Sequence, residues 1–355
     1  MKDNLNAIRL CLATLVLFSH SFAMLGVPQP GLFGWTLGSH AVNAFFAVSG
    51  YLVIGSYMRR PDIVQFGLNR ALRIVPALLV AVAFGRALYG WHGQYAGNPL
   101  PFRPNNSLWT IPWEITCYGA CAVAGMIGLL HHSRYNVVFA VVWVMVLAAS
   151  GSGDGSYALI LPMLLSFLTG GFITVYERQM DVAVAAAISA AAFAGLLIGK
   201  WLELLPRVLY FVPDLSEVRL ATIQQWLIIV ITAVCTIYLG KYAPPRLVLR
   251  EDYSYGVYLF AWPIQQVVVA TALPIGWALN PYSLAAAAIL LTFCVAAVSW
   301  HVIEKPALRL KRWGPRASSA LRRMGRHPTL DTSPFTGQPG LREQHLARSD
   351  RHSDR

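Results

Sequence analysis

Charged residues are scarce in this 355-residue chain: Asp, Glu, Lys and Arg together make up 12% of it, while 56% of its residues are hydrophobic. Soluble domains carry about 25% charged residues, so this composition excludes an ordinary water-soluble domain. Apolar runs of membrane-spanning length, about 20 residues each, recur along the sequence. The scarcity of charge therefore predicts an integral membrane protein with many helical spans.

Cysteine is also rare, and its spacing excludes two kinds of site. All five cysteines lie within apolar runs, and Cys117 and Cys121 are one helical turn apart rather than in a C-x-x-C pair. This pattern favours buried thiols and predicts neither a disulfide framework nor a metal site. The sequence also lacks the internal repeats typical of many transporters. Its first apolar run lacks a small-residue cleavage site, so we expect that run to be a retained span.

Ten apolar segments predict an all-α fold, a polytopic transmembrane helical bundle of about ten spans. They cover roughly residues 7–25, 39–57, 73–90, 109–130, 136–150, 157–176, 181–199, 220–240, 254–273 and 282–302. With the N-terminus placed inside, most of the 28 Lys and Arg residues fall on the cytoplasmic side. Because positive residues concentrate in cytoplasmic loops, we expect both termini in the cytoplasm.

The net charge of +12 comes largely from the C-terminus, where 12 of the 28 Lys and Arg residues lie from Lys305 onward. A basic segment after the last span favours cytoplasmic location and attraction to anionic membrane lipid. Nucleic acid is therefore not an expected partner. We predict a membrane domain over residues 1–312 and a basic, disordered cytoplasmic tail over residues 313–355.

The first apolar run carries an arginine near its start and a histidine near its middle. At about 1.5 Å per residue, Arg9 and His20 stand roughly 16 Å apart along a helix, about half a bilayer core. Ionisable groups at this depth cost at least about 2.5–3.5 kcal/mol, so they persist mainly where function or a buried partner supports them. We therefore predict that His20 is catalytic, because an imidazole can act as a base at neutral pH.

Two further features extend this candidate site. Arg70 and Arg73 are three residues apart, share a helix face at the cytoplasmic mouth, and suit a phosphate-bearing donor such as coenzyme A. Glu114 falls on the outer half of the fourth span. There it either orients His20, acts as a base itself, or forms a structural ion pair.

Small and aromatic residues supply the remaining candidates. Ser49 precedes Gly50 in the second span, and such a pair indicates either close helix packing or a substrate passage. We include Ser49 among the catalytic candidates. Aromatic residues at span ends also serve as interface anchors. The expected acceptor or passage residues are His40, Trp109, Trp113 and Tyr258.

Taken in order, these residues form a pattern that resembles the acyltransferase-3 family of integral membrane acyltransferases. The resemblance covers about residues 5–310 and is strong because six weak motifs occur in order. The motifs are Arg9 with His20, Phe45-Phe46-x-x-Ser49-Gly50-Tyr51-Leu52, Arg70-x-x-Arg73-Ile-x-Pro76, Ser107-Leu-Trp109-Thr-x-x-x-Glu114, Tyr255/Tyr258-Leu259 and Ile303-Glu304-Lys305-Pro306. Many members carry a histidine where this chain has Ala261, so no catalytic duty is expected there.

The resemblance implies transfer of an acyl group, commonly acetyl from cytosolic acetyl-CoA, to a hydroxyl of an extracytoplasmic carbohydrate such as an O-antigen or exopolysaccharide. It implies that His20 is the essential histidine and that Arg70 and Arg73 serve the donor side, where we also place Arg9. We expect acetyl-CoA, or another acyl-CoA, as a donor substrate and no permanently bound cofactor. The expected location is the bacterial inner (plasma) membrane.

Two mechanisms and two other classes of function compete with each other at this point. In the first mechanism His20 deprotonates the acceptor while Glu114 stabilises the imidazolium, as a carboxylate does in a hydrolase triad. In the second, an acyl-enzyme intermediate forms on His20 or Ser49. A membrane transporter or flippase of a glycan or acyl donor would perform no chemistry, and a structural scaffold would leave the buried His20 and Glu114 without a use. Consumption of labelled acetyl-CoA separates the enzyme from both.

Overall fold

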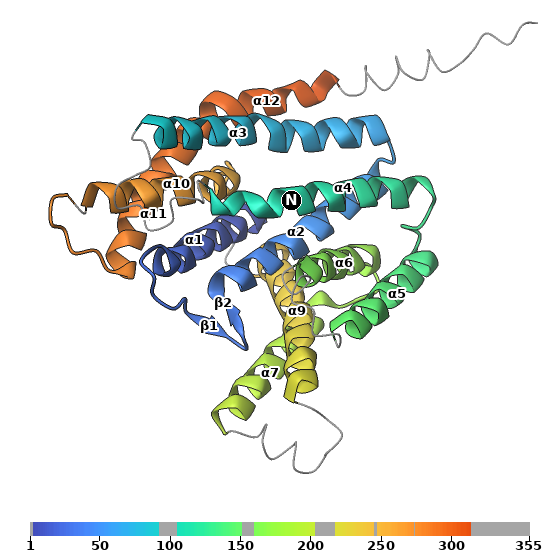
Figure 1. Ribbon diagram of the computed structural model, residues 1–355. Coiled ribbons are helices and arrows are strands. Elements are labelled where there is room, and N and C mark those ends of the chain that lie inside the picture. The colour runs from blue at the N-terminus through green and yellow to red at the C-terminus, as the bar shows by residue number, and fades with distance from the viewer. Residues whose placement is uncertain are drawn as a thin grey trace, which may run out of the picture.

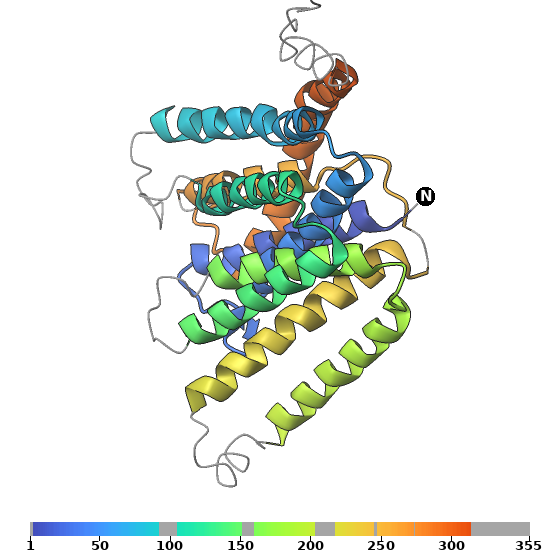
Figure 2. The same cartoon turned by 90° about the vertical axis from the view of Figure 1, so that its right-hand side faces the viewer.

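The computed structural model describes residues 3–91, 105–150, 160–202, 217–244, 247–272 and 274–313. Residues 92–104 and 203–216, and the predicted tail after residue 313, lie outside the described residues. The helices are α1 (Leu5–Met24), α2 (Leu37–Arg59), α3 (Ile63–Trp91), α4 (Ile111–Met126), α5 (His132–Ser150), α6 (Ile160–Tyr176), α7 (Val182–Trp201), α9 (Glu217–Lys241), α10 (Ser254–Ala272), α11 (Pro281–Ser299) and α12 (Lys305–Arg309). They lie side by side in one bundle, with α3 and α12 along one edge and α7 at the opposite edge (Figures 1 and 2).

The structure confirms a helical membrane architecture. In the described part of the chain, six helical stretches are long and apolar enough to cross a bilayer: Leu5–Met24, Leu37–Arg59, Ile63–Leu88, Val182–Trp201, Ala221–Lys241 and Pro281–Arg309. Helix α6 is apolar but shorter. Each of the ten apolar segments predicted from the sequence coincides with a helix. The fold is thus an integral membrane helical bundle.

Two local features differ from the sequence prediction. Helix α3 begins at Ile63, ten residues before the predicted segment, because the Asp62 side chain accepts a hydrogen bond from the backbone N–H of Gln65 and caps a polar first turn. Arg70, which precedes the predicted segment, therefore lies within the same helix as Arg73. A small antiparallel hairpin, β1 (Gly31–Leu32) and β2 (Trp35–Thr36), joins α1 to α2 and was not predicted.

Helices α2 and α6 cross at two glycines. A Cβ atom at Gly50 would lie 1.9 Å from the carbonyl oxygen of Phe167, and one at Gly170 would lie 1.9 Å from that of Ala47. Both distances are far below van der Waals contact, so only glycine permits this approach of the two backbones. The packing interpretation of the Ser-Gly pair therefore applies to Gly50.

Replacing Gly50 by alanine is expected to destabilise the bundle. The added methyl must push α6 away, and overpacking of this kind costs about 1–3 kcal/mol, which a lower melting temperature in detergent will reveal. Gly119→Ala in α4 is the matched control, because nothing lies within 4 Å of a Cβ there. An equal melting temperature for Gly50→Ala and the wild type would refute the tight crossing.

Candidate active site

Two adjacent cavities lie inside the bundle. The cationic cavity has a volume of about 270 Å³ and is lined by side chains from α1, α2, α3, α4, α10 and the 3₁₀ segments η1 (Asn106–Thr110) and η4 (Leu310–Trp313). The neutral cavity has a volume of about 340 Å³ and is lined from α1, the hairpin, α2, η1, α6 and α10. Val42 and Tyr258 line both cavities. A wall that is one side chain thick therefore separates them at these residues.

The cationic cavity gathers four basic side chains from distant parts of the sequence. Arg9 comes from α1, Arg70 and Arg73 come from successive turns of α3, and Lys311 comes from η4. The three predicted donor-binding arginines are thus brought together. Lys311 was missed, because in the sequence it is one of many basic residues after the last span.

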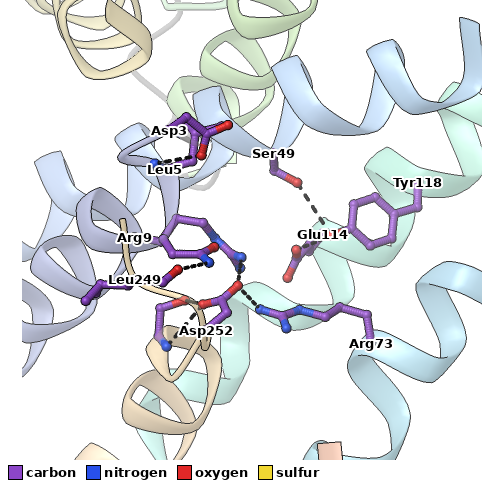
Figure 3. A network of polar contacts seen from close by, with 11 residues as sticks. Asp3, Leu5, Arg9, Ser49, Arg73, Glu114, Tyr118, Leu249 and Asp252 are labelled. Atoms are coloured by element: carbon purple, nitrogen blue, oxygen red, sulfur yellow. Dashed lines mark hydrogen bonds and ion pairs between the residues drawn. The ribbon is translucent and has the colours of Figure 1, made fainter. Parts of the chain in front are cut away.

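Asp252 is the counter-ion that holds two of these cations. Its Oδ2 atom pairs with a guanidinium nitrogen of Arg9 and, at 2.6 Å, with Nη2 of Arg73 (Figure 3). The hydroxyl of Ser254 donates to the other carboxylate oxygen at 2.5 Å. Burial alone would raise the pKa of Asp252, but the two guanidinium groups and Ser254 lower this pKa to about 2. Asp252 is therefore ionised at neutral pH and fixes both arginines.

The other two cations have no carboxylate partner among the described residues. The guanidinium carbon of Arg70 lies 5.5 Å from the ring centroid of Phe66 and 5.6 Å from that of Tyr118, and its Nε atom is buried without a hydrogen bond. Burial lowers the pKa of Lys311, and the nearby positive charges of Arg73 and Arg70 lower it further. Arg70 and Lys311 are thus available to bind an anion.

Ser49 and Glu114 face the cationic cavity and are linked through a tyrosine. Ser49 donates a long hydrogen bond of 3.5 Å to the hydroxyl of Tyr118, which in turn donates to Glu114 (Figure 3). The partner of Glu114 is one turn further along its own helix, where residues four apart meet. His20, in contrast, lines the neutral cavity. The hypothesised hydrogen bond between His20 and Glu114 is not formed.

His20 stands in surroundings without charge. None of the described residues that line the neutral cavity is Asp, Glu, Lys or Arg; its polar side chains are Gln29, Thr36, Ser39, Asn43 and Asn106. The imidazole meets Trp262 edge-on, with 5.0 Å between ring centroids. Its Nδ1 atom is buried and has no hydrogen-bond partner. Because buried polar atoms are nearly always paired, this nitrogen is available to a ligand hydroxyl or a water molecule.

The predicted acceptor and passage residues separate into three groups. Trp109 lines the neutral cavity, whereas Trp113 packs against the hydrophobic core and lines neither cavity. His40 also lines neither; its Nε2 atom lies 3.0 Å from the carbonyl oxygen of Leu32 and ties α2 to the hairpin. Tyr258 stands in the wall between the cavities.

The hydroxyl of Tyr258 fixes that wall. It shares a hydrogen bond of 2.8 Å with Oγ1 of Thr110, and the ring packs edge-on against Phe45 at 6.0 Å. Three residues further along the same helix, Ala261 is 1% exposed and packs with Leu17 and Ala288. Ala261 is therefore a small core residue that lines neither cavity.

The family of the chain follows from its sequence relatives. The profile of a family described as an acyltransferase domain, acyltransferase-3, matches residues 2–301. The chain belongs to this family. An O-acetyl transferase of Shigella phage Sf6 is 30% identical over 336 residues, which cover 84% of this chain and 93% of the relative. Nodulation protein 10 of Rhizobium leguminosarum bv. viciae is 25% identical over 366 residues, covering 87% and 94%. No solved structure matches the chain.

Membership confirms the resemblance seen in the motifs and makes the protein an integral membrane acyltransferase. Tyr118 and Lys311, which line this acyltransferase's cationic cavity, and Asp252, which pairs with two of its arginines, were not singled out from the sequence. A tyrosine one turn after Glu114 was a usable signal. Asp252 lies three residues before Tyr255 of the predicted motif, outside any apolar run. The position of an acidic residue directly before a predicted span was the signal that sequence reasoning overlooked.

Proposed function

We propose that this acyltransferase moves an acyl group, in the simplest case acetyl, from cytosolic acyl-CoA to a hydroxyl of an extracytoplasmic or lipid-linked carbohydrate. The observation that carries the proposal is the pair of adjacent cavities with different chemistry, one cationic and one neutral, that share a wall at Val42 and Tyr258. The name of the phage relative, O-acetyl transferase, supports acetyl as the transferred group.

The cationic cavity suits the donor. Guanidinium groups bind phosphate oxygens through paired hydrogen bonds, and acyl-CoA carries a diphosphate close to its acyl-bearing arm. Arg70 has an unpaired buried Nε atom, while Arg9 and Arg73 are already fixed by Asp252. We assign the diphosphate to Arg70 and the adjacent Arg73, with Arg9 and Asp252 holding Arg73 in place. The acyl arm then points toward Tyr258 and the neutral cavity.

The neutral cavity suits a carbohydrate acceptor. Its side-chain amides and hydroxyls can each donate to and accept from a sugar hydroxyl, and the absence of charge among its described lining residues disfavours an ionic ligand. Trp35 and Trp109 offer flat apolar faces beside these groups. Such a combination of apolar surface with a few polar groups is typical of small-molecule sites.

His20 acts in this proposal as the general base. It removes the proton from the acceptor hydroxyl, whose oxygen attacks the thioester carbonyl; the carbon–sulfur bond breaks, and the imidazolium returns the proton to the CoA thiolate. The reaction thus yields one ester and one thiol, with all atoms and charges balanced. A neutral surrounding favours the uncharged imidazole that this step needs. Ser49, Tyr118 and Glu114 face the donor side and would orient the acyl arm.

The same proposal includes the membrane topology. We infer about ten spans with both termini in the cytoplasm, a membrane domain over residues 1–312 and a basic tail over 313–355, in a bacterial inner membrane. The cationic cavity supports this orientation, because it combines the first turns of α1, the N-terminal half of α3 and the C-terminal η4. A cytosolic donor would meet all of them on one side.

The test is acceptor-dependent release of CoA thiol. Purified protein in detergent is incubated with acetyl-CoA, with and without cell-envelope glycan, and the glycan is then examined for ester-linked label. We expect thiol release and labelled glycan only when both substrates are present. Movement of glycan across a reconstituted membrane without consumption of acetyl-CoA would contradict the proposal and favour a transporter.

A further inference from the structure

The C-terminal strap, residues 300–313, closes one side of the cationic cavity. A π-helix (Trp300–Glu304) follows α11, and then α12 and η4 run beside α3 (Figure 1). Glu251 anchors its start by accepting hydrogen bonds from Trp300 at 2.5 Å and Lys305 at 2.6 Å. The strap is thus a fixed part of the cavity and not a free end.

The other end of the strap is anchored on α3. The side-chain amide of Gln65 donates to the backbone carbonyl of Lys311 at 3.4 Å and to Asn69 at 2.9 Å. This contact leaves the Lys311 side chain free to line the cavity together with Arg70 and Asn69. Arg309, two residues earlier on the strap, is exposed and does not line the cavity. Among the described side chains of the strap, Lys311 is therefore the basic one that lines the cavity.

The charge of the cavity is unbalanced at this end. Asp252 pairs with Arg9 and Arg73, whereas Lys311 has no carboxylate partner among the described residues and faces the positive charges of Arg70 and Arg73. Partly buried like charges repel each other unless an anion lies between them. A second anionic group, separate from the one at Arg70, would therefore stabilise the charge of Lys311.

We propose that Lys311 is a specificity residue that binds the 3′-phosphate of the CoA donor, while the arginines bind the diphosphate. This inference rests on the proposed function, since it takes acyl-CoA as the donor. Acyl-CoA carries two separate anionic groups, the diphosphate and the 3′-phosphomonoester, which match the two unpaired cations. A lysine suits the compact monoester, because its ammonium is a point charge on a flexible stem.

The proposal is tested by direct binding, which needs neither acceptor nor turnover. Dissociation constants of CoA and 3′-dephospho-CoA are measured by calorimetry on the detergent-solubilised protein. We expect the wild type to bind CoA about 10-fold or more tightly than 3′-dephospho-CoA, because hydrogen bonds to charged groups are worth about 1.5–3 kcal/mol. Lys311→Ala should weaken CoA binding to the level of 3′-dephospho-CoA and leave binding of 3′-dephospho-CoA within about twofold.

Two further variants complete the design. Arg309→Ala removes one positive charge from the same strap outside the cavity and should leave both constants unchanged, whereas Lys311→Arg should retain most of the preference for CoA. Equal losses for both ligands in Lys311→Ala, or no loss for either, would overturn the role of Lys311. Failure of the proposed function is a separate result: the wild type would discriminate between the two ligands but transfer no acetyl group. No binding of CoA at all would overturn both.

Discussion

Replacing His20 by alanine is expected to lower the turnover number for acetyl transfer by about 10²- to 10⁴-fold, the range that a positioned general base contributes. His20 lines the neutral cavity, and its buried Nδ1 atom has no hydrogen-bond partner. No other histidine is among the described residues that line this cavity. The side chains to which we assign CoA binding line the other cavity. The dissociation constant of CoA should therefore remain unchanged, so that only the chemical step is lost.

The measurement is acceptor-dependent thiol release at saturating acetyl-CoA, together with the melting temperature in detergent. His20→Gln keeps a polar side chain of similar length and should be equally inactive, because an amide cannot take up the proton. His131→Ala is the control, since His131 is exposed and lines neither cavity. A turnover number of His20→Ala within about threefold of the wild type would refute the role of His20 as base and as acyl carrier.

The same variants distinguish the two mechanisms. If His20 is a base, no protein-bound label accumulates when the wild type is mixed with labelled acetyl-CoA without acceptor. If an acyl-enzyme forms on His20 or Ser49, the label stays with the protein, and the corresponding variant abolishes it. The placement of His20 and Ser49 in different cavities favours the base mechanism, because no imidazole of the described residues lines the cavity of Ser49 and could activate its hydroxyl.

Features that repeat with a helical period could be predicted from the sequence. The apolar segments predicted the helices. The spacing of Arg70 and Arg73 predicted that both lie on one face of α3, because residues three apart on a helix lie close together. The crossing of α2 and α6 was signalled by Gly50, although its partner Gly170 became visible only when the helices were placed side by side. Local rules suffice where the contact is local.

Contacts between distant residues could not be predicted in this way. Asp252 and Arg9 are 243 positions apart, and nothing near either residue identifies the other as its partner. For the same reason the sequence left open whether Glu114 orients His20, and the structure places the two residues in different cavities. The depth of each residue in the membrane was estimated separately, and depth alone does not determine which cavity a residue lines. The two cavities are separated by the wall at Val42 and Tyr258, which only the folded structure shows.

Replacing Asp252 by asparagine is expected to cause the largest loss of stability in the cationic cavity, about 3–5 kcal/mol, as is typical when one partner of a buried ion pair is removed. The side chains of Arg9, Arg73 and Asp252 are only 21%, 16% and 11% exposed, so water cannot replace the lost carboxylate. The two guanidinium groups would then repel each other. The variant should melt at a lower temperature, and CoA should raise that temperature more than it does for the wild type, because phosphate supplies the missing anion.

The pH dependence separates this charge effect from a change of shape. The folded-state pKa of Asp252, about 2, lies below its ordinary value of 3.8, so the ionised carboxylate stabilises the folded protein. This contribution is fully present above an ordinary aspartate pKa and is lost as the pH falls toward the folded-state value. The difference in melting temperature between wild type and Asp252→Asn should therefore be constant from about pH 5 to 8 and should narrow below about pH 4.

Two variants control this experiment. Asp181→Asn makes the same chemical change at the N-cap of α7, where the side chain accepts backbone hydrogen bonds from Ala183 and Val184 and forms no ion pair with any described cation. Asparagine caps helices as well as aspartate does, so this variant should melt like the wild type. Asp252→Glu keeps the charge and should recover part of the stability. If Asp252→Asn melts like the wild type, or if the difference persists undiminished to pH 3, Asp252 does not act through its charge and the arginines are held by packing alone.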